Sequence, residues 1–439
     1  MLPQNERQRI IALINSEVVP AIGCTEPMAV ALCTCRAAEA LGERPLQINV
    51  LLSGNILKNA MGVGIPGTGM VGLPIAIALG ALIGKSEYEL EVLRDVTPQA
   101  VEQGRQYMDE KRINIGLKQS NCPDKLYIEV TCIGEMGNSS RAIIQHDHTH
   151  FVHVSRTIGG KTSVLLCEEP DNELPTDDNC ADTDQGLTLR KVYEFATTSP
   201  IEELSFINEA RRLNEQAARE SLRGNYGHEL GKTLSRPLGR GIMGDTIFSH
   251  ILSETSSACD ARMAGAMIPV MSNSGSGNQG IAATLPVCVF GRENHNTEDE
   301  ITRALVLSHL TAIYIKQSLG KLSALCGCVV ASTGSSCGIT YLMGGSYEQV
   351  AYSVKNMIAN LAGMVCDGAK PSCALKVSSG VSTAVLSAML AIQNRYVTSV
   401  EGLIEDDVDR CIHNLTRIGA DGMNETDQMV LDIMTHKRS

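Results

Sequence analysis

The sequence predicts an α+β protein that joins an N-terminal mixed α/β domain, with a small and mostly antiparallel sheet, to a large all-helical C-terminal domain. Two changes of hydrophobic period support this prediction. Between residues 114 and 167 apolar and polar residues alternate, as in strands that bury one face. From 201 to 437 the apolar residues recur at helical spacing. An acidic, proline-containing stretch at 168–184 separates the two regimes, so we expect domains at 1–195 and 196–439.

The elements of the N-terminal domain follow from the same periodicity. Helices are predicted at residues 6–22, 27–40, 74–83 and 98–110. Thr25 and Pro27 mark the start of the second helix, because threonine caps helix N-termini and proline fits the first turn. Strands are predicted at 46–53, 126–132, 140–145, 149–155 and 162–166. Residues 54–69 are rich in glycine and form a predicted loop that carries Lys58 and Asn59.

Composition argues against several classes of protein. Of the 439 residues, 43% are hydrophobic and 20% are charged, which is typical of a folded globular chain. The formal charge of −12, without any basic stripe, argues against a nucleic-acid partner. The longest apolar run, at 71–83, is too short to cross a bilayer, and residues 1–9 are polar, unlike a secretory signal. We therefore expect a cytoplasmic protein that binds no membrane and whose fifteen cysteines stay reduced.

One segment of the helical domain does not fit an apolar core. Residues 364–376 place two cysteines, an aspartate and two lysines between long apolar stretches. Gly368 and Pro371 break regular structure, and buried charge is costly unless it is paired or bound to a metal. We interpret this segment as a loop in which Cys366 and Cys373 bind an iron–sulfur cluster.

Two cysteines do not complete such a cluster. A [4Fe–4S] cluster takes up to four thiolates, and three of them leave one iron open to act as a Lewis acid. Four cysteines in neighbouring apolar segments are candidates for the third ligand: Cys288, Cys326, Cys328 and Cys337. Spacing does not choose among them. The alternative is that all of these side chains are core thiols, since free cysteines behave as small hydrophobic residues.

A second candidate is Cys24, in the turn Gly-Cys-Thr-Glu-Pro at 23–27. A thiol beside a helix N-terminus has a lowered pKa, so its thiolate is more accessible there. Together with Glu26, this cysteine is a candidate for catalysis. The alternative is a small residue packed at a turn.

A third candidate is the group His146, His148 and His150. In a strand, residues i, i+2 and i+4 share a face, so the three imidazoles would point the same way, as in a metal or proton-transfer site. The alternative is a polar, exposed strand face.

The fourth candidate is the Ser-Asn-Ser-Gly-Ser-Gly-Asn-Gln-Gly segment at 272–280. A loop of small residues that opens a helix offers bare N–H groups and hydroxyls, which suit a carboxylate or a phosphate. Ser274, Ser276 and Asn278 are the candidates for such contacts. No Gly-Lys-Ser/Thr follows, so the segment is not a P-loop. The alternative is a simple interhelical loop.

Taken together, the motifs at 23–27, 274–280, 325–327 and 366–373 resemble those of the archaeal and bacterial L-cysteine desulfidases. These enzymes are relatives of the iron–sulfur L-serine dehydratases and share their α-chain domain. The resemblance covers essentially the whole chain. Its most specific parts are the Gly-Cys-Thr-Glu-Pro turn and the cysteine loop.

The resemblance implies an oxygen-sensitive [4Fe–4S] cluster and no pyridoxal phosphate. Its implied ligands are Cys326, Cys366 and Cys373, with Cys328 as the rival to Cys326. It also implies that Cys24 acts as the catalytic base. In the implied reaction, a carbon–sulfur lyase converts L-cysteine into pyruvate, ammonia and hydrogen sulfide by α,β-elimination.

The substrate of such an enzyme is a small amino acid. We expect six side chains to bind it: Lys58, Asn59, Ser274, Ser276, Asn278 and His148. The main alternative is L-serine dehydration by the same site. A non-catalytic iron–sulfur sensor and a zinc or pyridoxal-phosphate enzyme are further alternatives. We also expect a homo-oligomer, with a symmetric dimer as the commonest arrangement.

Overall fold

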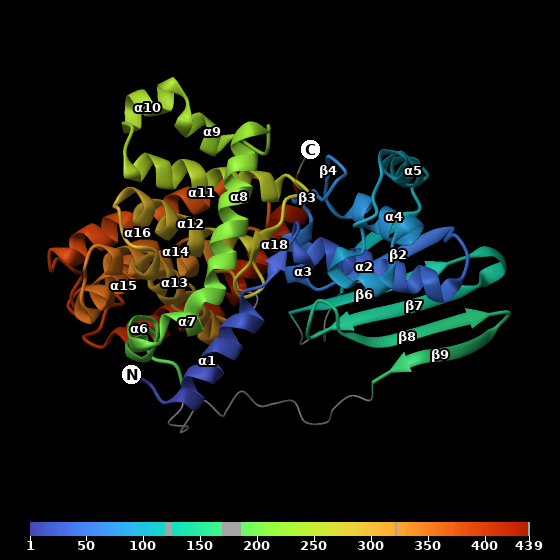
Figure 1. The fold of residues 1–439 in the computed structure, drawn as a ribbon. Coiled ribbons are helices and arrows are strands. Elements are labelled where there is room, and N and C mark those ends of the chain that lie inside the picture. Colours follow the sequence, from blue (N-terminus) through green and yellow to red (C-terminus); the bar gives the residue numbers. More distant parts are fainter. Residues whose placement is uncertain (119–124, 169–185, 321–322, 438–439) are drawn as a thin grey trace. The chain divides into compact units, whose positions relative to one another are not determined.

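The chain folds into two compact units in a computed structural model (Figure 1). The structure describes residues 1–118, 125–168, 186–320 and 323–437. Residues Cys24–Gly186 form one unit, here called the sheet unit. Met1–Gly23 and Leu187–Ser439 form the other, the helical unit. The acidic stretch predicted at 168–184 lies, apart from its first residue, outside the described residues.

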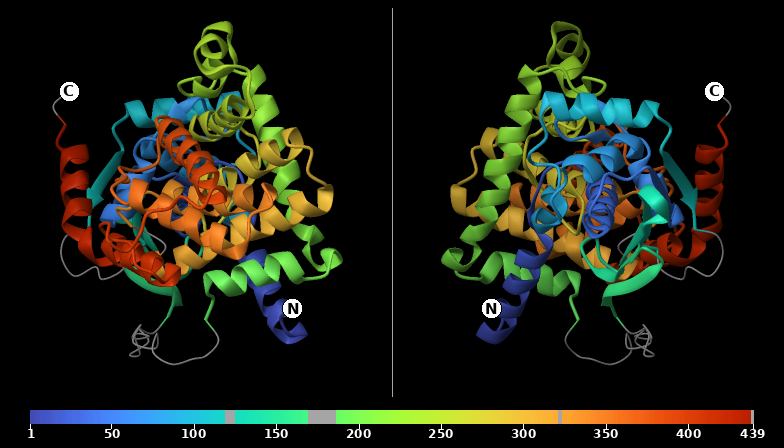
Figure 2. Two further views of the ribbon diagram at one scale, coloured as in Figure 1. Left: turned by 90° about the vertical axis from the view of Figure 1, so that its left-hand side faces the viewer. Right: turned by 90° about the vertical axis from the view of Figure 1, so that its right-hand side faces the viewer.

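Helix α1 (Gln4–Glu17) belongs to the helical unit. The Arg7 guanidinium donates to the Glu203 carboxylate, with an Nε–Oε2 distance of 2.8 Å. Strand β1 (Pro20–Ala21) pairs antiparallel with β10 (Val270–Met271). Both views of Figure 2 show this first helix, in dark blue, beside the green helices that follow residue 187. The compact units thus divide the chain differently from the expected 1–195 and 196–439, because these long-range contacts have no local sequence signal.

The sheet unit is built on six strands in the order β5-β2-β6-β7-β8-β9. Their bounds are β2 (Gln47–Leu52), β5 (Ile113–Leu117), β6 (Tyr127–Ile133), β7 (Ser139–Gln145), β8 (Phe151–Ile158) and β9 (Lys161–Cys167). Strands β2 and β5 pair in parallel, whereas the other neighbours pair antiparallel. The small, mostly antiparallel sheet agrees with the prediction, although β5 was not among the predicted strands.

Helices α2 (Thr25–Leu41), α4 (Leu73–Ile83) and α5 (Pro98–Asp109) lie on one side of this sheet in Figure 1. Helix α2 lies directly against strands β6 and β7, where the buried Cys33 thiol donates to the Ala142 carbonyl at 3.4 Å. Complete burial of a large aliphatic side chain stabilises the folded state by about 1.5–3 kcal/mol. The face of the sheet that packs on α2 is therefore the core of the unit.

The glycine-rich segment at 54–69 is not wholly a loop, and this part of the prediction was wrong. It begins with helix α3 (Gly54–Ala60), which places Lys58 and Asn59 on a helix. Residues Ile56 and Ala60 are fully buried four positions apart, which is the spacing of one helix face. The remainder forms a short hairpin of strands β3 (Gly64–Ile65) and β4 (Met70–Val71).

The helical unit is built almost entirely from helices, as predicted for this part of the chain. After α1 its helices are α6 (Leu189–Thr198), α7 (Ile201–Leu204), α8 (Asn208–Arg223), α9 (Leu230–Ser235), α10 (Pro237–Met243), α11 (Ile247–Met263), α12 (Gly277–Glu293), α13 (Glu298–Leu319), α14 (Gly327–Leu342), α15 (Tyr347–Leu361), α16 (Cys373–Ile392), α17 (Val408–Arg417) and α18 (Asn424–Thr435). Helix α14 contacts α12, α13, α15 and α16 and is the centre of the core. A Cβ added to Gly334 would lie 2.2 Å from the Ser308 carbonyl oxygen, so glycine permits the close approach of α13 and α14.

Helix α16 is, among the described residues, the one helix long and apolar enough to cross a membrane by length and composition. Half of its most apolar stretch is buried inside the helical unit. A core helix passes the same test, and α16 packs against α11, α14 and α15.

Candidate active site

The cysteine loop brings Cys366 beside Cys326, two of the predicted ligands. Leu325 and Val365 form an antiparallel bridge between the segments that carry them. The Cys326 amide donates to the Met364 carbonyl at 2.9 Å, and the Cys366 amide donates to the Ala324 carbonyl at 2.7 Å. Two segments distant in sequence are therefore held together by backbone hydrogen bonds, independently of any metal.

Two of these cysteines also stand at helix N-termini. Cys326 is the N-cap of α14, and Cys373 is the first residue of α16. The first turn of a helix carries unpaired N–H groups and a partial positive charge, which favours anions and thiolates. Burial raises the pKa of Cys373, and a hydrogen bond with Cys328 is the main reason that the pKa of Cys326 is raised. Both thiols are therefore protonated at neutral pH, and the binding of a metal would displace their protons.

Two further thiols lie close to Cys326, Cys366 and Cys373, which are called the cysteine group from here on. The Sγ atoms of Cys326 and Cys328 are 3.3 Å apart, and Cys328 also contacts the Met364 sulfur at 3.2 Å. Cys259 on α11 is fully buried; burial is the main cause of its raised pKa, and the thiols of Cys373 and Cys326 raise that pKa further. Sequence reasoning missed Cys259, because it comes from a helix with no cysteine motif.

The other two cysteines considered as the third ligand have different surroundings. Cys288 lies on α12, where its electrostatic neighbours are Glu215 and Arg211. Cys337 lies inside α14, and its neighbours include the hydroxyls of Thr311 and Ser353. Both are fully buried and behave as core thiols.

The charges of the cysteine loop pair with one another. The Asp367 carboxylate accepts from Lys370 at 2.6 Å and also from Lys376. Burial would raise the pKa of Asp367, but the two lysines outweigh it and lower that pKa to about 2. Gly368 adopts a φ of 86°, which suits glycine and forms the bend between Cys366 and Cys373. The loop is therefore braced by its own ion pairs.

The polar segment at 272–280 forms a tight turn and the start of α12. Ser276 is the N-cap of α12, and its hydroxyl accepts from the Gln279 amide. Ser274, with a φ of 48°, donates its hydroxyl proton to the Asn273 side chain at 2.9 Å. The buried Oδ1 atom of Asn278 has no hydrogen-bond partner within the described part of the chain. The expectation of a loop that opens a helix is confirmed.

Gln279 connects this turn to the cysteine group. A Cβ added to Gly327 would lie 2.9 Å from Cδ of Gln279, so the glutamine side chain packs on the residue that follows Cys326. Its buried Oε1 atom also lacks a partner among the described residues. The N-termini of α12 and α14 thus meet at a place where a buried amide oxygen remains unsatisfied.

In the sheet unit, Cys24 is the N-cap of α2 and is buried. Its thiol donates to Oε2 of Glu26 at 2.8 Å. The Asn59 amide donates to Oε1 of the same carboxylate at 3.2 Å, and the neighbouring Lys58 is 1% exposed. The structure thus brings Cys24 and Asn59 together around Glu26, which forms a thiol–carboxylate pair held by an amide.

The three histidines do not share a strand face, and this prediction was wrong. They lie in the turn between β7 and β8, where His146 has a φ of 67°. His150 contacts the Gln145 carbonyl at 3.2 Å and the Glu168 carboxylate at 3.0 Å. The buried Nε2 atom of His148 has no hydrogen-bond partner among the described residues. Five consecutive polar residues favour a hairpin turn over a continuous strand, and alternation alone did not reveal it.

Over the described ranges, no three His, Cys, Asp or Glu side chains converge on a point that would hold a single metal ion. A [4Fe–4S] cluster makes a different demand, because each thiolate binds its own iron atom. The helical unit supplies the thiol donors that such a cluster uses, at helix N-termini that favour an anionic group. In the chemistry of its donors, the cysteine group fits a cluster.

Comparisons with known proteins agree with this type of site. The family model described as serine dehydratase alpha chain matches residues 87–432. A UPF0597 protein of Phocaeicola vulgatus is 64% identical over 442 aligned residues, which cover the whole of both chains. A UPF0597 protein of Bacteroides fragilis is 65% identical over 99% of this chain and 100% of its own, and one of Oleidesulfovibrio alaskensis is 46% identical over 99% of each.

This chain therefore belongs to the serine dehydratase alpha chain family. The predicted relation to the α-chain domain of the iron–sulfur L-serine dehydratases is confirmed. The membership indicates a lyase of the serine dehydratase type, a group that is associated with iron–sulfur clusters.

Proposed function

We propose that this protein is an L-cysteine desulfidase that depends on a [4Fe–4S] cluster. It converts L-cysteine and water into pyruvate, ammonia and hydrogen sulfide by α,β-elimination. One observation carries the proposal: Cys326 and Cys366 lie on bridged segments, and Cys373 begins a helix beside them. The motifs around Cys24 and in the cysteine loop favour cysteine as the substrate, because they resemble those of the desulfidases.

In this proposal Cys326, Cys366 and Cys373 hold the cluster. When bound, the cluster supplies a Lewis acid that polarises the bond to the leaving sulfide. Lys376 is oriented by Asp367 and raises the positive potential near Cys326 and Cys366. Lys376 thus favours the thiolate forms of Cys326 and Cys366, which are the forms that bind iron.

The α-proton of the substrate requires a base, and we assign that role to Cys24. Its thiol already donates to the Glu26 carboxylate, so the proton has an acceptor and the resulting thiolate can remove the α-proton. Asn59 holds the other carboxylate oxygen and fixes the pair. Six side chains are proposed to bind the substrate: Lys58, Asn59, Ser274, Ser276, Asn278 and His148.

Anaerobic reconstitution followed by iron and acid-labile sulfide analysis tests the cluster. Cys373→Ser is expected to lose iron, sulfide and turnover of L-cysteine together. Cys337→Ser is the matched control, because Cys337 is a buried thiol of the same unit with hydroxyl-bearing neighbours, Thr311 and Ser353. Wild-type protein that binds no iron, or equal iron in both variants, contradicts the proposed ligands.

A Cys24→Ala variant separates the base from the cluster. It is expected to keep its iron and lose at least about 100-fold in kcat, the range for a missing general base. Loss of iron in this variant would instead make Cys24 a ligand.

L-Serine dehydration is the second candidate function, and the family model favours it by its description. The two substrates differ in the leaving group, hydroxide or sulfide, at the same carbon. Steady-state kinetics of the reconstituted protein with both amino acids distinguish the two, and a higher kcat/KM for L-serine would overturn our choice.

We also propose a homodimer. Helix α16 exposes four apolar side chains: Leu375, Leu386, Met389 and Leu390. A second copy is one partner that would cover them. Light scattering after size-exclusion chromatography tests this proposal, and a monomeric mass would contradict it.

A further inference from the structure

Arg262, near the end of α11, is a buried cation that has no counter-charge among the described residues. Its side chain is 4% exposed, and its Nε atom has no hydrogen-bond partner within the described residues. The nearest carboxylate in sequence, Asp260, accepts from the backbone amides of His228 and Gly231 instead. An unpaired buried charge is costly, so this arrangement is typical of an anion-binding site.

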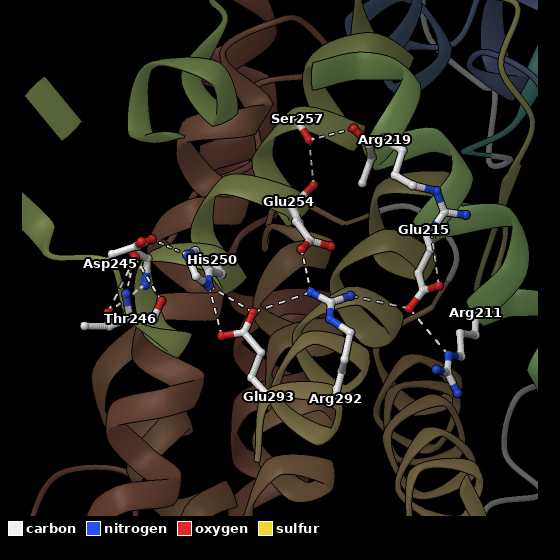
Figure 3. Close-up of polar contacts among 12 residues, drawn as sticks. Arg211, Glu215, Arg219, Asp245, Thr246, His250, Glu254, Ser257, Arg292 and Glu293 are labelled. Carbon is white, nitrogen blue, oxygen red and sulfur yellow. Dashed lines mark hydrogen bonds and ion pairs between the residues drawn. The ribbon is translucent and has the colours of Figure 1, made fainter. Parts of the chain in front are cut away.

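Several other arginines of the helical unit, unlike Arg262, are paired with carboxylates. Figure 3 shows Arg292 between Glu254 and Glu215, with Arg211 on the far side of Glu215. Arg292 contacts the Glu254 carboxylate at 2.6 Å, although its side chain is 41% exposed. The half-exposed Arg292 is thus paired with carboxylates, whereas no carboxylate of the described residues pairs with the buried Arg262.

The Arg262 side chain lies against the N-terminus of α12. A Cβ added to Gly277, the first residue of that helix, would lie 2.2 Å from Nε and 2.9 Å from Cζ of Arg262. The first amides of a helix have no intrahelical acceptor and attract anions. A guanidinium and these amides together suit a planar carboxylate, which accepts two parallel hydrogen bonds.

Two hydrogen-bond acceptors without partners lie in the same helix turn. They are the buried Oδ1 of Asn278 and the buried Oε1 of Gln279, which the described residues leave unsatisfied. An ammonium group has three donors and no acceptor, so it satisfies such oxygens. A guanidinium against Gly277, together with two such oxygens in the same first turn of α12, is complementary to the two charged groups of a zwitterion.

We propose that Arg262 and the first turn of α12 bind the carboxylate of an α-amino acid, and that Asn278 and Gln279 accept from its ammonium group. This deepens the proposed function and rests on it for the identity of the substrate, L-cysteine. The cysteine group is close to Arg262. Besides burial, the Arg262 guanidinium and the thiols of Cys373 and Cys326 all influence the pKa of Cys259. Arg262 is thus a binding residue for the substrate.

L-Alanine is the probe, since it carries both charged groups but no leaving group. Isothermal titration calorimetry on the reconstituted protein measures its affinity without turnover. Arg262→Gln is expected to weaken binding about 10- to 100-fold, the loss of a charge-assisted hydrogen bond, whereas Arg292→Gln retains it. L-Alaninamide, which lacks the carboxylate, is expected to bind weakly to the wild type and equally weakly to Arg262→Gln.

Stability and iron content complete the test. Arg262→Gln removes an unpaired buried charge, so its urea midpoint is expected to stay equal or rise, whereas that of Arg292→Gln falls. Failure of the wild type to bind L-alanine overturns the inference, as does equal affinity in Arg262→Gln. Loss of iron with unchanged affinity would make Arg262 a counter-ion of the cluster. Arginine-dependent binding of L-alanine without any turnover of L-cysteine would sink the proposed function alone.

Discussion

The buried His309 predicts a pH dependence of stability whose sign and size follow from its contacts. This side chain on α13 is completely buried. Its Nδ1 atom is 3.1 Å from Nδ2 of Asn273, and its Nε2 atom is 2.9 Å from the Thr284 hydroxyl. Because the asparagine NH₂ group donates, Nδ1 must accept and Nε2 carries the proton. A proton on Nδ1 would face another donor, so the fold holds the neutral ring.

Burial lowers the pKa of His309 from 6.5 to about 3. The unfolded chain therefore takes up a proton first as the pH falls, and the native state loses stability relative to it. The contribution is fully present above about pH 6.5 and is lost as the pH falls toward about 3. Integration of the linkage relation gives a loss of about 2 kcal/mol between about pH 8 and about pH 5.

His309→Gln tests this magnitude. Glutamine offers one acceptor and one donor group to the same neighbours but does not titrate. Urea unfolding, followed by far-ultraviolet circular dichroism, is measured for both proteins at about pH 8 and about pH 5. Other titrating groups are common to both, so the double difference isolates His309. The wild type is expected to lose about 2 kcal/mol more than the variant.

Parallel loss of stability in the two proteins would refute this reasoning. A larger loss in the variant would reverse its sign and indicate that His309 is charged in the native state. NMR titration of the ring, with no shift between about pH 8 and about pH 5, is the independent check of the same pKa.

Two other predictions concern the same unit. Gly280→Ala is expected to destabilise by more than about 2 kcal/mol in urea unfolding, because the added Cβ would lie 1.9 Å from the Met271 carbonyl oxygen. Gly241→Ala, with no atom within 4 Å of the new Cβ, is expected to stabilise by up to about 1 kcal/mol, and a similar loss in both would contradict the steric argument. For His250, the hydrogen bond to Glu293 is the main cause of a raised pKa, so its contribution is present below about pH 6.5 and lost as the pH rises. His250→Gln is therefore expected to cost about 0.5–1 kcal/mol at about pH 5.5 and nothing at about pH 9, and a constant difference would refute the ion pair.

The sequence predicts most of the elements because they depend on local pattern. Helix α4, the strand β7 and the long helices after residue 201 follow from hydrophobic period. It does not predict where a chain bends against that pattern. The turn at His146 needs a positive φ that no glycine signals, and α3 begins at Gly54, a residue that ordinarily weakens a helix.

The candidate site shows the same division between local and distant information. Cys366 and Cys373 stand out because charged residues and helix breakers surround them in the sequence. Cys326 comes beside Cys366 through a bridge of Leu325 and Val365, a pairing that single-residue patterns do not specify.

Arg262 is the residue that sequence reasoning was least able to find. In the sequence it stands two positions after Asp260, which suggests an ion pair that satisfies both charges. Residues i and i+2 of a helix do not face each other, however, so this pair cannot form on α11. Asp260 accepts hydrogen bonds from the His228 and Gly231 amides instead, and Arg262 packs against Gly277 at the start of α12. Only the positions of both side chains reveal that Arg262 has no counter-charge within the described part of the chain, and this absence indicates a ligand.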